Sequence, residues 1–184
     1  NCRVIPNRGS WLDFEYDVKD FLYFKIDRKK KILASSLLLA LGFTKSDIAN
    51  EFYENEKFIY DTNSQKWKTK FNPENYKAKN FSEEVIDANT GKVVIKLGDK
   101  INYLNAKKLS NEGLKNILVS KESLYGKFLH RDIKISDEEG GTFKIGTELN
   151  ETIIQQILDA KIYTLDISVT NSINKGGYLL TTIF

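Results

Sequence analysis

Strict alternation of side-chain type over residues 8–17 (RGSWLDFEYD) is the feature that most constrains the fold of this chain. Successive side chains of a β-strand point to opposite faces, so the alternation predicts a strand with Leu12, Phe14 and Tyr16 on its buried face. The opposite face then carries the other side chains of the pattern, Trp11, Asp13, Glu15 and Asp17. The chain is therefore expected to begin with a sheet that has one apolar and one acidic face.

A second strand is predicted for residues 21–26 (FLYFKI), because aromatic and β-branched residues dominate this segment. Residues 18–20, between the two predicted strands, are few and polar enough to turn the chain. The two strands are therefore expected to form a hairpin.

Two short helices are predicted to follow a basic cluster at residues 27–31. The apolar run from residue 32 to residue 41 predicts a helix that ends at Gly42, because glycine is favoured just beyond a helix C-terminus. Thr44 with Asp47 three residues later resembles a capping box, which opens the second helix. The pair predicts an αα-hairpin and makes the expected fold class α+β.

Farther along, residues 57–60 and 66–69 predict another hairpin, and an internal repeat follows it. Residues 97–119 align with residues 145–167 at an offset of 48, which places Gly98 on Gly146, for example. Each copy is interpreted as a strand, a glycine turn, a short helix and a strand. We therefore expect two similar β-turn-α-β units packed in one core, because no polar catalytic residue type recurs between the copies.

The excess positive charge lies at the start of the chain. Residues 1–31 hold eight of the 28 Lys and Arg residues and five of the 25 Asp and Glu residues, which leaves 20 of each sign elsewhere. The net charge of +3 therefore belongs to residues 1–31. A polyanion attracted by formal charge is expected to meet this segment.

Several classes of function are excluded by simple counts. One cysteine, Cys2, excludes an internal disulfide and a cysteine-rich zinc site, and one histidine, His130, excludes multi-histidine metal sites. The longest apolar stretch, residues 32–43, is interrupted by serine and glycine and is too short to span a membrane. The chain also contains no methionine, which favours an interior piece of a longer polypeptide.

The acidic strand face has two interpretations. Asp13, Glu15 and Asp17 would lie roughly 7 Å apart along one face, a spacing that suits Mg²⁺ or Ca²⁺ and a small metal-dependent hydrolase. The simpler interpretation is a solvated face whose charges discourage edge-to-edge strand pairing. No further acidic cluster or glycine-shaped metal loop accompanies these residues, so the simpler interpretation is preferred and no metal or catalytic residue is predicted.

A candidate nucleic-acid site combines the basic cluster with an exposed aromatic residue one hairpin away. Cations hold phosphates while an aromatic ring stacks on a base, and this combination suits a single strand of nucleic acid. The predicted site residues are Trp11, Asp27, Arg28, Lys29, Lys30 and Lys31. A solvated basic surface is the competing interpretation.

Residues 2–53 closely resemble the β subunit of bacterial DNA-directed RNA polymerase. The resemblance rests on Ile5-Pro6, the block from Arg8 to Glu15 (RGSWLDFE), Ile26-Asp27-Arg28 before basic residues, and Leu39-Ala40-Leu41-Gly42 before a second helix. Residues 1–53 would then be part of the β lobe domain and 54–170 a proteobacterial insertion. Residues 171–184 would be a return segment to the lobe.

The resemblance implies a role in transcription by a nucleotidyltransferase. In that family the residues matching Trp11, Asp27 and Arg28 face the single non-template DNA strand, and the lobe lines the cleft for the downstream duplex. Lys29, Lys30 and Lys31 stand where arginines are frequent, and lysine lacks the bidentate fork of arginine. The catalytic Mg²⁺ belongs to the other large subunit, so this piece is expected to have no cofactor and to be non-catalytic.

The same resemblance implies partners and a location. The expected partners are the other polymerase subunits and sigma factor, together with regulators of the secondary channel at the insertion. A cytoplasmic, nucleoid-associated location without a membrane follows. The remaining alternative is a free-standing protein-interaction module without DNA affinity, in which the repeat is the working surface.

Overall fold

A computed structural model describes residues 1–19, 21–76, 79–80, 84–96, 98–136, 141–170 and 176–183. The chain divides into two compact units. Unit 1 comprises residues 1–55, 127–148 and 168–184, and unit 2 comprises residues 56–126 and 149–167. The predicted boundary at residue 53 lies near the first of these divisions, while the assignment of lobe and insertion to the two parts stays a prediction.

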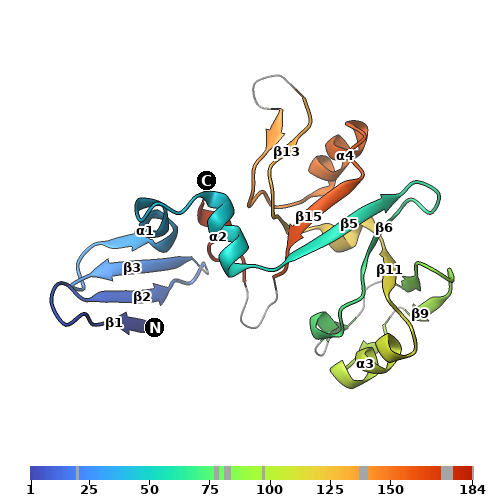
Figure 1. The fold of residues 1–184 in the computed structure, drawn as a ribbon, viewed down its shortest axis with the longest axis horizontal. Helices are drawn as coiled ribbons and strands as arrows, with labels where there is room; N and C mark the ends of the chain where they lie inside the picture. Colours follow the sequence, from blue (N-terminus) through green and yellow to red (C-terminus); the bar gives the residue numbers. More distant parts are fainter. Residues whose placement is uncertain are drawn as a thin grey trace. The chain divides into compact units, whose positions relative to one another are not determined.

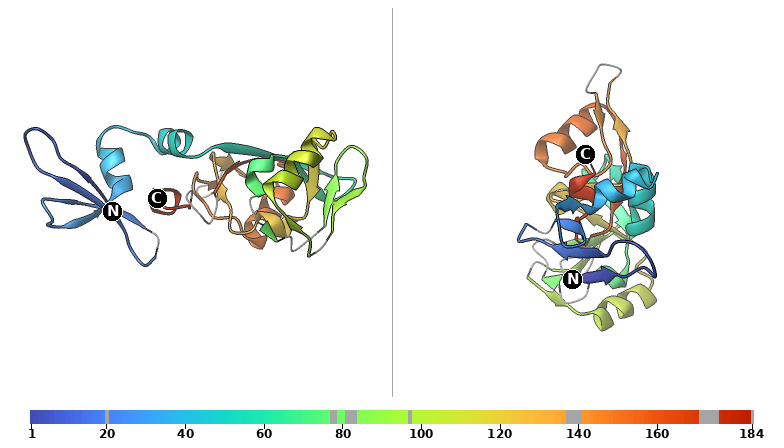
Figure 2. Two further views of the ribbon diagram at one scale, coloured as in Figure 1. Left: turned by 90° about the horizontal axis from the view of Figure 1, so that it is seen from below. Right: turned by 90° about the vertical axis from the view of Figure 1, so that its left-hand side faces the viewer.

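The predicted N-terminal hairpin is confirmed and belongs to a larger antiparallel sheet in unit 1 (Figures 1 and 2). The strands follow the order β1-β2-β3-β4, with bounds Cys2–Val4, Leu12–Tyr16, Leu22–Ile26 and Lys31–Leu33. Between β2 and β3, the Asp17 carboxylate accepts the backbone N–H groups of Lys19 at 2.8 Å and Phe21 at 3.0 Å. The predicted turn residue Asp20 lies outside the described residues.

The start predicted for the first helix is wrong. Residues 31–33 form β4, which pairs with β3, and helix α1 covers only Ala34–Ala40. An apolar run without polar punctuation fits either a strand or a helix, and pairing with β3 decides between them. The predicted end at Gly42 is confirmed: Gly42 has φ +95°, and the Phe43 and Gly42 N–H groups bond to the Leu38 and Leu39 carbonyls, the pattern of a Schellman motif.

The predicted capping box is also confirmed. Helix α2 covers Lys45–Phe52, and the Thr44 hydroxyl accepts the Asp47 N–H at 3.1 Å while the Asp47 carboxylate accepts the Thr44 N–H at 2.8 Å. Each group satisfies a donor that a helix N-terminus leaves without an intrahelical partner. Sequence-local chemistry therefore fixes where α2 begins.

The core of unit 1 joins α2 to the C-terminal segment. Ile48 and Ala49 are fully buried against Leu180 and Ile183. The Tyr53 hydroxyl donates to the Gly176 carbonyl at 3.0 Å and accepts the Leu179 N–H at 3.2 Å. Residues 176–183 thus pack in unit 1, while residues 171–175 and 184 lie outside the described residues, and the role of 171–184 as a return segment stays a prediction.

His130 links three segments of unit 1. Its side chain is 2% exposed, with Nε2 3.0 Å from Asn50 Oδ1 and Nδ1 2.9 Å from Ser168 Oγ. Because the carboxamide oxygen only accepts, Nε2 carries the proton and Nδ1 accepts from the serine hydroxyl. Both ring nitrogens are therefore satisfied by side chains that are 38 and 80 residues away in the sequence.

Unit 1 also contains short strands near His130. Their bounds are β12, Phe128–Leu129; β13, Ile133–Lys134; and β14, Thr142–Phe143, with a 3₁₀ turn at Leu180–Thr182. Strands β13 and β14 pair antiparallel with each other. No helix in the described part of the chain is both long and apolar enough to cross a membrane.

Six neighbouring strands of one sheet lie mainly in unit 2, in the order β15-β5-β6-β11-β8-β9, and the pairings from β5 to β9 are antiparallel. The bounds are β5, Asn55–Asp61; β6, Lys66–Lys70; β8, Val85–Asp87; β9, Val93–Ile95; β11, Asn116–Val119; and β15, Thr164–Ser168. The pairing of β5 with β6 confirms the second predicted hairpin. Outside this sheet, β7, Lys79–Asn80, pairs with β10, Lys100–Ile101, and 3₁₀ turns cover Pro73–Tyr76 and Lys121–Leu124.

The internal repeat appears in the backbone at the predicted offset. Helix α3, Tyr103–Asn111, is repeated by α4, Glu151–Asp159, and β11 is repeated by β15. Gly98 and Gly146 share a positive φ, at +84° and +83°. Residues 97–119 and 149–167 lie in unit 2, whereas residues 145–148, the start of the second copy, lie in unit 1, so one core shared by the two complete copies stays a prediction. Leu97, the first residue of the first copy, lies outside the described residues.

Equivalent asparagines cap the two repeated helices, and this leads to a test. The side chains of Asn102 and Asn150 each accept a backbone N–H three residues on, from Asn105 and Ile153, both at 2.9 Å. We expect alanine at either cap to lower the free energy of unfolding by about 1 kcal/mol, measured by urea denaturation. Alanine at Asn105, whose side chain does not cap the helix, is the matched control; an equal loss there would contradict the capping role.

Candidate nucleic-acid interface

The basic cluster forms a tight turn between β3 and β4. Asp27 and Arg28 have φ values of +48° and +59°, and the Lys29 N–H bonds to the Ile26 carbonyl at 3.0 Å. Positive φ at both central residues is typical of a type I′ turn, which matches the twist of antiparallel strands. Aspartate tolerates this conformation better than most residues, while arginine does not. The turn holds Arg28 in a conformation that its own side chain disfavours.

Reciprocal hydrogen bonds join this turn to Trp11. The Trp11 N–H donates to the Asp27 carboxylate at 2.9 Å, and the Asp27 N–H donates to the Trp11 carbonyl at 3.0 Å. The Trp11 side chain is 42% exposed. Two residues predicted for the site are thus held together across 16 positions of sequence, with the indole accessible.

Arg3 is a residue of this region that sequence reasoning missed. Strand β1 places Arg3 opposite Asp13, and the two side chains form an ion pair whose second hydrogen bond, from Nη2 to Oδ2, measures 3.2 Å. The Arg3 guanidinium carbon also lies 5.3 Å from the centroid of the Trp11 ring, within cation–π range. Only the pairing of β1 with β2 brings these three side chains together, so no local sequence signal could have predicted the contacts of Arg3.

Lys31 differs from the other basic residues of the cluster. It belongs to β4, where its ammonium lies 4.1 Å from the Tyr23 ring centroid and 3.9 Å from Glu15. Lys25 also pairs with Glu15, at 2.8 Å. Lys31 is exposed but lies on the sheet face, where it contacts Glu15 and Tyr23, so its part in the predicted series of cations from residue 28 to residue 31 stays a prediction.

The acidic face of the hairpin is held by cations of the same sheet. Asp13 bonds to Arg3, and Glu15 contacts Lys25 and Lys31. Asp17 instead shapes the β2–β3 turn. Within the described ranges, no group of three or more histidine, cysteine or acidic side chains is arranged to hold a metal ion. These contacts account for the three carboxylates without a metal ion. Because β2 lies between β1 and β3, the carboxylates do not protect a sheet edge as the simpler interpretation expected.

The electrostatics of the turn stabilise an ionised Asp27. The Ser10 hydroxyl, followed by the Trp11 N–H, lowers the pKa of the Asp27 carboxyl below its ordinary value. The hydrogen bond from Arg3 likewise lowers the pKa of Asp13. Both carboxylates are therefore charged at neutral pH and stay so in moderately acidic solution.

Acid is expected to release Trp11 from the turn. A carboxyl with a lowered pKa contributes stability above its unfolded pKa, and that contribution is lost as the pH falls through the folded value. We predict that the Trp11 amide proton shift, followed by NMR, titrates with a midpoint below 3.8, the ordinary pKa of aspartate. The substitution Asp27→Asn keeps an acceptor oxygen but removes the ionisable group, so this titration should disappear; its persistence would assign the effect to another group.

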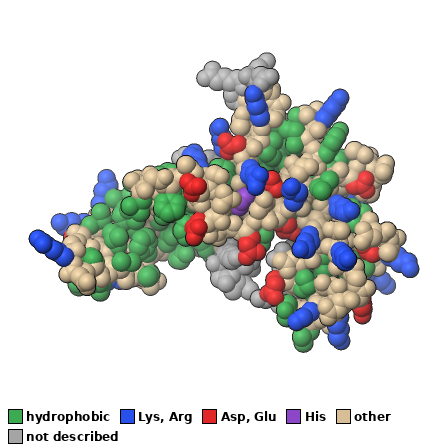
Figure 3. Space-filling view, in the orientation of Figure 1, with side chains coloured by type: hydrophobic (Ala, Val, Ile, Leu, Met, Phe, Trp, Pro, Cys, Tyr) green, Lys and Arg blue, Asp and Glu red, His purple; other side chains and the backbone are tan. Residues whose placement is uncertain are grey.

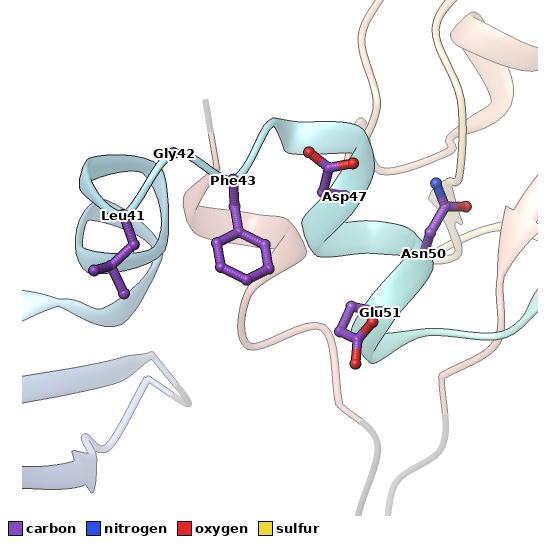
Figure 4. Close-up of a pocket in the computed structure, with 6 residues that line it drawn as sticks. All are labelled: Leu41, Gly42, Phe43, Asp47, Asn50 and Glu51. Atoms are coloured by element: carbon purple, nitrogen blue, oxygen red, sulfur yellow. The ribbon is translucent and has the colours of Figure 1, made fainter.

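Basic side chains gather at one end of the sheet of unit 1. Figure 3 shows Lys and Arg side chains (blue) at the end where Figure 1 places the β1–β2 loop and the β3–β4 turn. Arg28, Lys29 and Lys30 are all exposed there. A cleft of about 460 Å³ elsewhere in unit 1 runs beside the α1–α2 connection and is lined by Gly42 and Glu51, among others (Figure 4). It includes none of the predicted site residues.

Comparison with known proteins places this region in a family. The sequence model described as RNA polymerase Rpb2, domain 2, matches residues 3–125. The chain belongs to this family. The matched segment contains Trp11, the β3–β4 turn and the first copy of the repeat.

Curated relatives agree with the family match. The chain is 39% identical over 184 residues to a protein named DNA-directed RNA polymerase subunit beta from Rickettsia prowazekii. It is 40% identical to proteins of the same name from Rickettsia felis, over 184 residues, and Rickettsia canadensis, over 186. Each alignment covers 100% of this chain and 13% of the relative. The resemblance to bacterial RNA polymerase β subunits is confirmed.

Proposed function

We propose that the chain works in transcription as part of the β subunit of a DNA-directed RNA polymerase and contacts the single non-template strand of DNA. The observation that carries the proposal is the pair of hydrogen bonds between Trp11 and Asp27. They hold an accessible aromatic ring beside three exposed cations, Arg28, Lys29 and Lys30. The family membership and the relatives' names support the same role.

Each side chain then has a distinct task. The Trp11 ring stacks on an unpaired base, while the cations of the turn attract the phosphates on either side of it. Arg3 occupies one side of the indole and limits its motion, which leaves the ring prepared for stacking. Every base has an aromatic face on which the indole can stack, so this arrangement favours single-stranded DNA of varied sequence.

Asp27 is a positioning residue in this proposal. Its carboxylate bonds to the Trp11 N–H and to the Ser10 hydroxyl, so it fixes the β1–β2 loop against the turn. It also favours the tight turn that exposes Arg28. We assign no catalytic residue and no metal ligand to this chain; the Mg²⁺ chemistry of polymerisation is expected on the other large subunit.

The salt dependence of DNA binding tests the proposal. We expect the variant with Arg28, Lys29 and Lys30 all changed to glutamine to bind single-stranded DNA with a slope of log K against log salt that is smaller by about 2, since each phosphate contact contributes about 0.7. Fluorescence anisotropy of a labelled oligonucleotide measures the slope. Lys31→Gln is the matched control, because Lys31 already contacts Glu15 and Tyr23.

The expected result for Lys31→Gln is a much smaller change of slope. An unchanged slope in the triple variant would remove the turn from the DNA interface. If single-stranded DNA makes no contact with this chain in the assembled polymerase, that result would instead favour the alternative of a protein-interaction module.

The partners and location follow from the same proposal. The other polymerase subunits and sigma factor would surround the lobe, which lines the path of the downstream duplex in a cytoplasmic, nucleoid-associated enzyme. Residues 54–170 would be a lineage-specific insertion that offers a surface to regulators of the secondary channel.

A further inference from the structure

A second cationic region lies in unit 1, away from the β3–β4 turn. A cleft of about 630 Å³ opens beside the start of α2, and its lining includes Lys45, Arg131 and Lys144. These three cations come from separate segments: α2, the residues after β12, and the residues after β14. The fold therefore gathers like charges that are distant in sequence.

The residues that line the cleft carry more positive than negative charge. Among the described residues that line it, Asp132 is the acidic one. Asp132 already accepts the Ile145 N–H at 2.7 Å and the Lys144 ammonium at 3.3 Å. The lining thus carries three positive charges and one negative charge, which favours an anion in the cleft.

Hydrogen bonds position the segments that line the cleft. His130, next to Arg131, is held by Asn50 and Ser168, and Asn50 itself lines the cleft. Figure 4 shows Asn50 projecting from α2 on the side away from Leu41 and Phe43. The capping box of Thr44 and Asp47 fixes the start of α2, which carries Lys45. The cations therefore extend from segments whose backbone is already positioned, which lowers the entropy lost on binding.

The donors match phosphate. Arginine offers a planar fork of N–H groups and lysine a mobile ammonium, the two side chains that proteins use for phosphate oxygens. The Ser46 hydroxyl accepts from Asn50 Nδ2 at 3.3 Å, so its own proton can be donated to a ligand oxygen. We propose that the cleft between Lys45, Arg131 and Lys144 binds phosphate groups, either of a free phosphorylated molecule or of a nucleic-acid backbone.

Calorimetry on the full chain with inorganic pyrophosphate tests this site. We expect Lys45→Gln and Arg131→Gln each to weaken pyrophosphate binding by about five-fold, since each removes one charged contact. The matched control is Lys92→Gln in unit 2, an exposed lysine whose loss removes the same charge. An equal weakening by the control, or no measurable binding by the unmodified chain, would overturn the proposal.

Further experiments distinguish the two sources of phosphate and distinguish this site from the β3–β4 turn. If a short single-stranded oligonucleotide competes with pyrophosphate, and the competition is lost in Arg131→Gln, the site binds a nucleic-acid backbone. If pyrophosphate binds and the oligonucleotide does not compete, the site binds free phosphorylated molecules. Lys45→Arg keeps the charge and should keep the affinity, and a loss there would contradict the proposal. Trp11→Ala should leave pyrophosphate binding unchanged. The proposal for this site and the proposal for the DNA-binding turn can therefore be refuted separately.

Discussion

Replacement of Trp11 by alanine should shorten the lifetime of open promoter complexes formed by a polymerase that contains this β subunit. Stacking of a base on an aromatic side chain contributes about 1–3 kcal/mol, so the lifetime should fall by about 5- to 150-fold. The indole is exposed and is held by Asp27 and Arg3, so the substitution removes the ring without opening the core. Dissociation in the presence of a competitor measures the lifetime directly.

Two control variants sharpen this result. Trp11→Phe keeps an aromatic face and should retain much of the lifetime. Tyr163→Ala removes another aromatic side chain of similar exposure, 41% against 42%, from unit 2 and should have no effect. An unchanged lifetime for Trp11→Ala on several promoters would refute the stacking role.

Replacement of His130 by alanine should lower the free energy of unfolding by about 2–4 kcal/mol. The change creates a cavity at a side chain that is 2% exposed and leaves the partner groups on Asn50 and Ser168 without their bonds. Guanidinium denaturation followed by circular dichroism measures the loss. The expected cost is large because one imidazole joins α2 to segments near the end of the chain.

The neighbouring residue supplies the matched control. Arg131→Ala changes an exposed side chain and should alter the free energy of unfolding by less than about 0.5 kcal/mol. His130→Gln should recover part of the loss, because a carboxamide can replace one of the two bonds. A cost for His130→Ala as small as that for Arg131→Ala would show that the linkage does not stabilise unit 1.

Local chemistry explains which elements were predictable. The alternation over residues 8–17 predicted β2 because its period is that of a strand, and Thr44 with Asp47 predicted the start of α2. Both signals act within a few residues. The apolar character of residues 32 and 33 suits a helix and a strand equally, and only pairing with β3 makes them a strand.

The site was predictable only in part, for the same reason. The charge pattern and the resemblance to polymerase β subunits both indicated Trp11 and the basic cluster, but neither specified the geometry of the site. Arg3 contacts Trp11 through the pairing of β1 with β2, and Lys31 turns onto the sheet through β4. Such contacts depend on register between strands, which residue types alone do not specify.

The chain passes between its two units at four points, and these points determine how it can be shortened: 55/56, 126/127, 148/149 and 167/168. The backbone enters unit 2 twice and leaves it twice, and residues 127–148 supply His130 and Arg131 to unit 1 between the two visits. A single deletion from 56 to 167 would therefore remove a structural part of the first unit together with the second. Engineering a minimal version requires two excisions and two new linkers, with the middle segment retained.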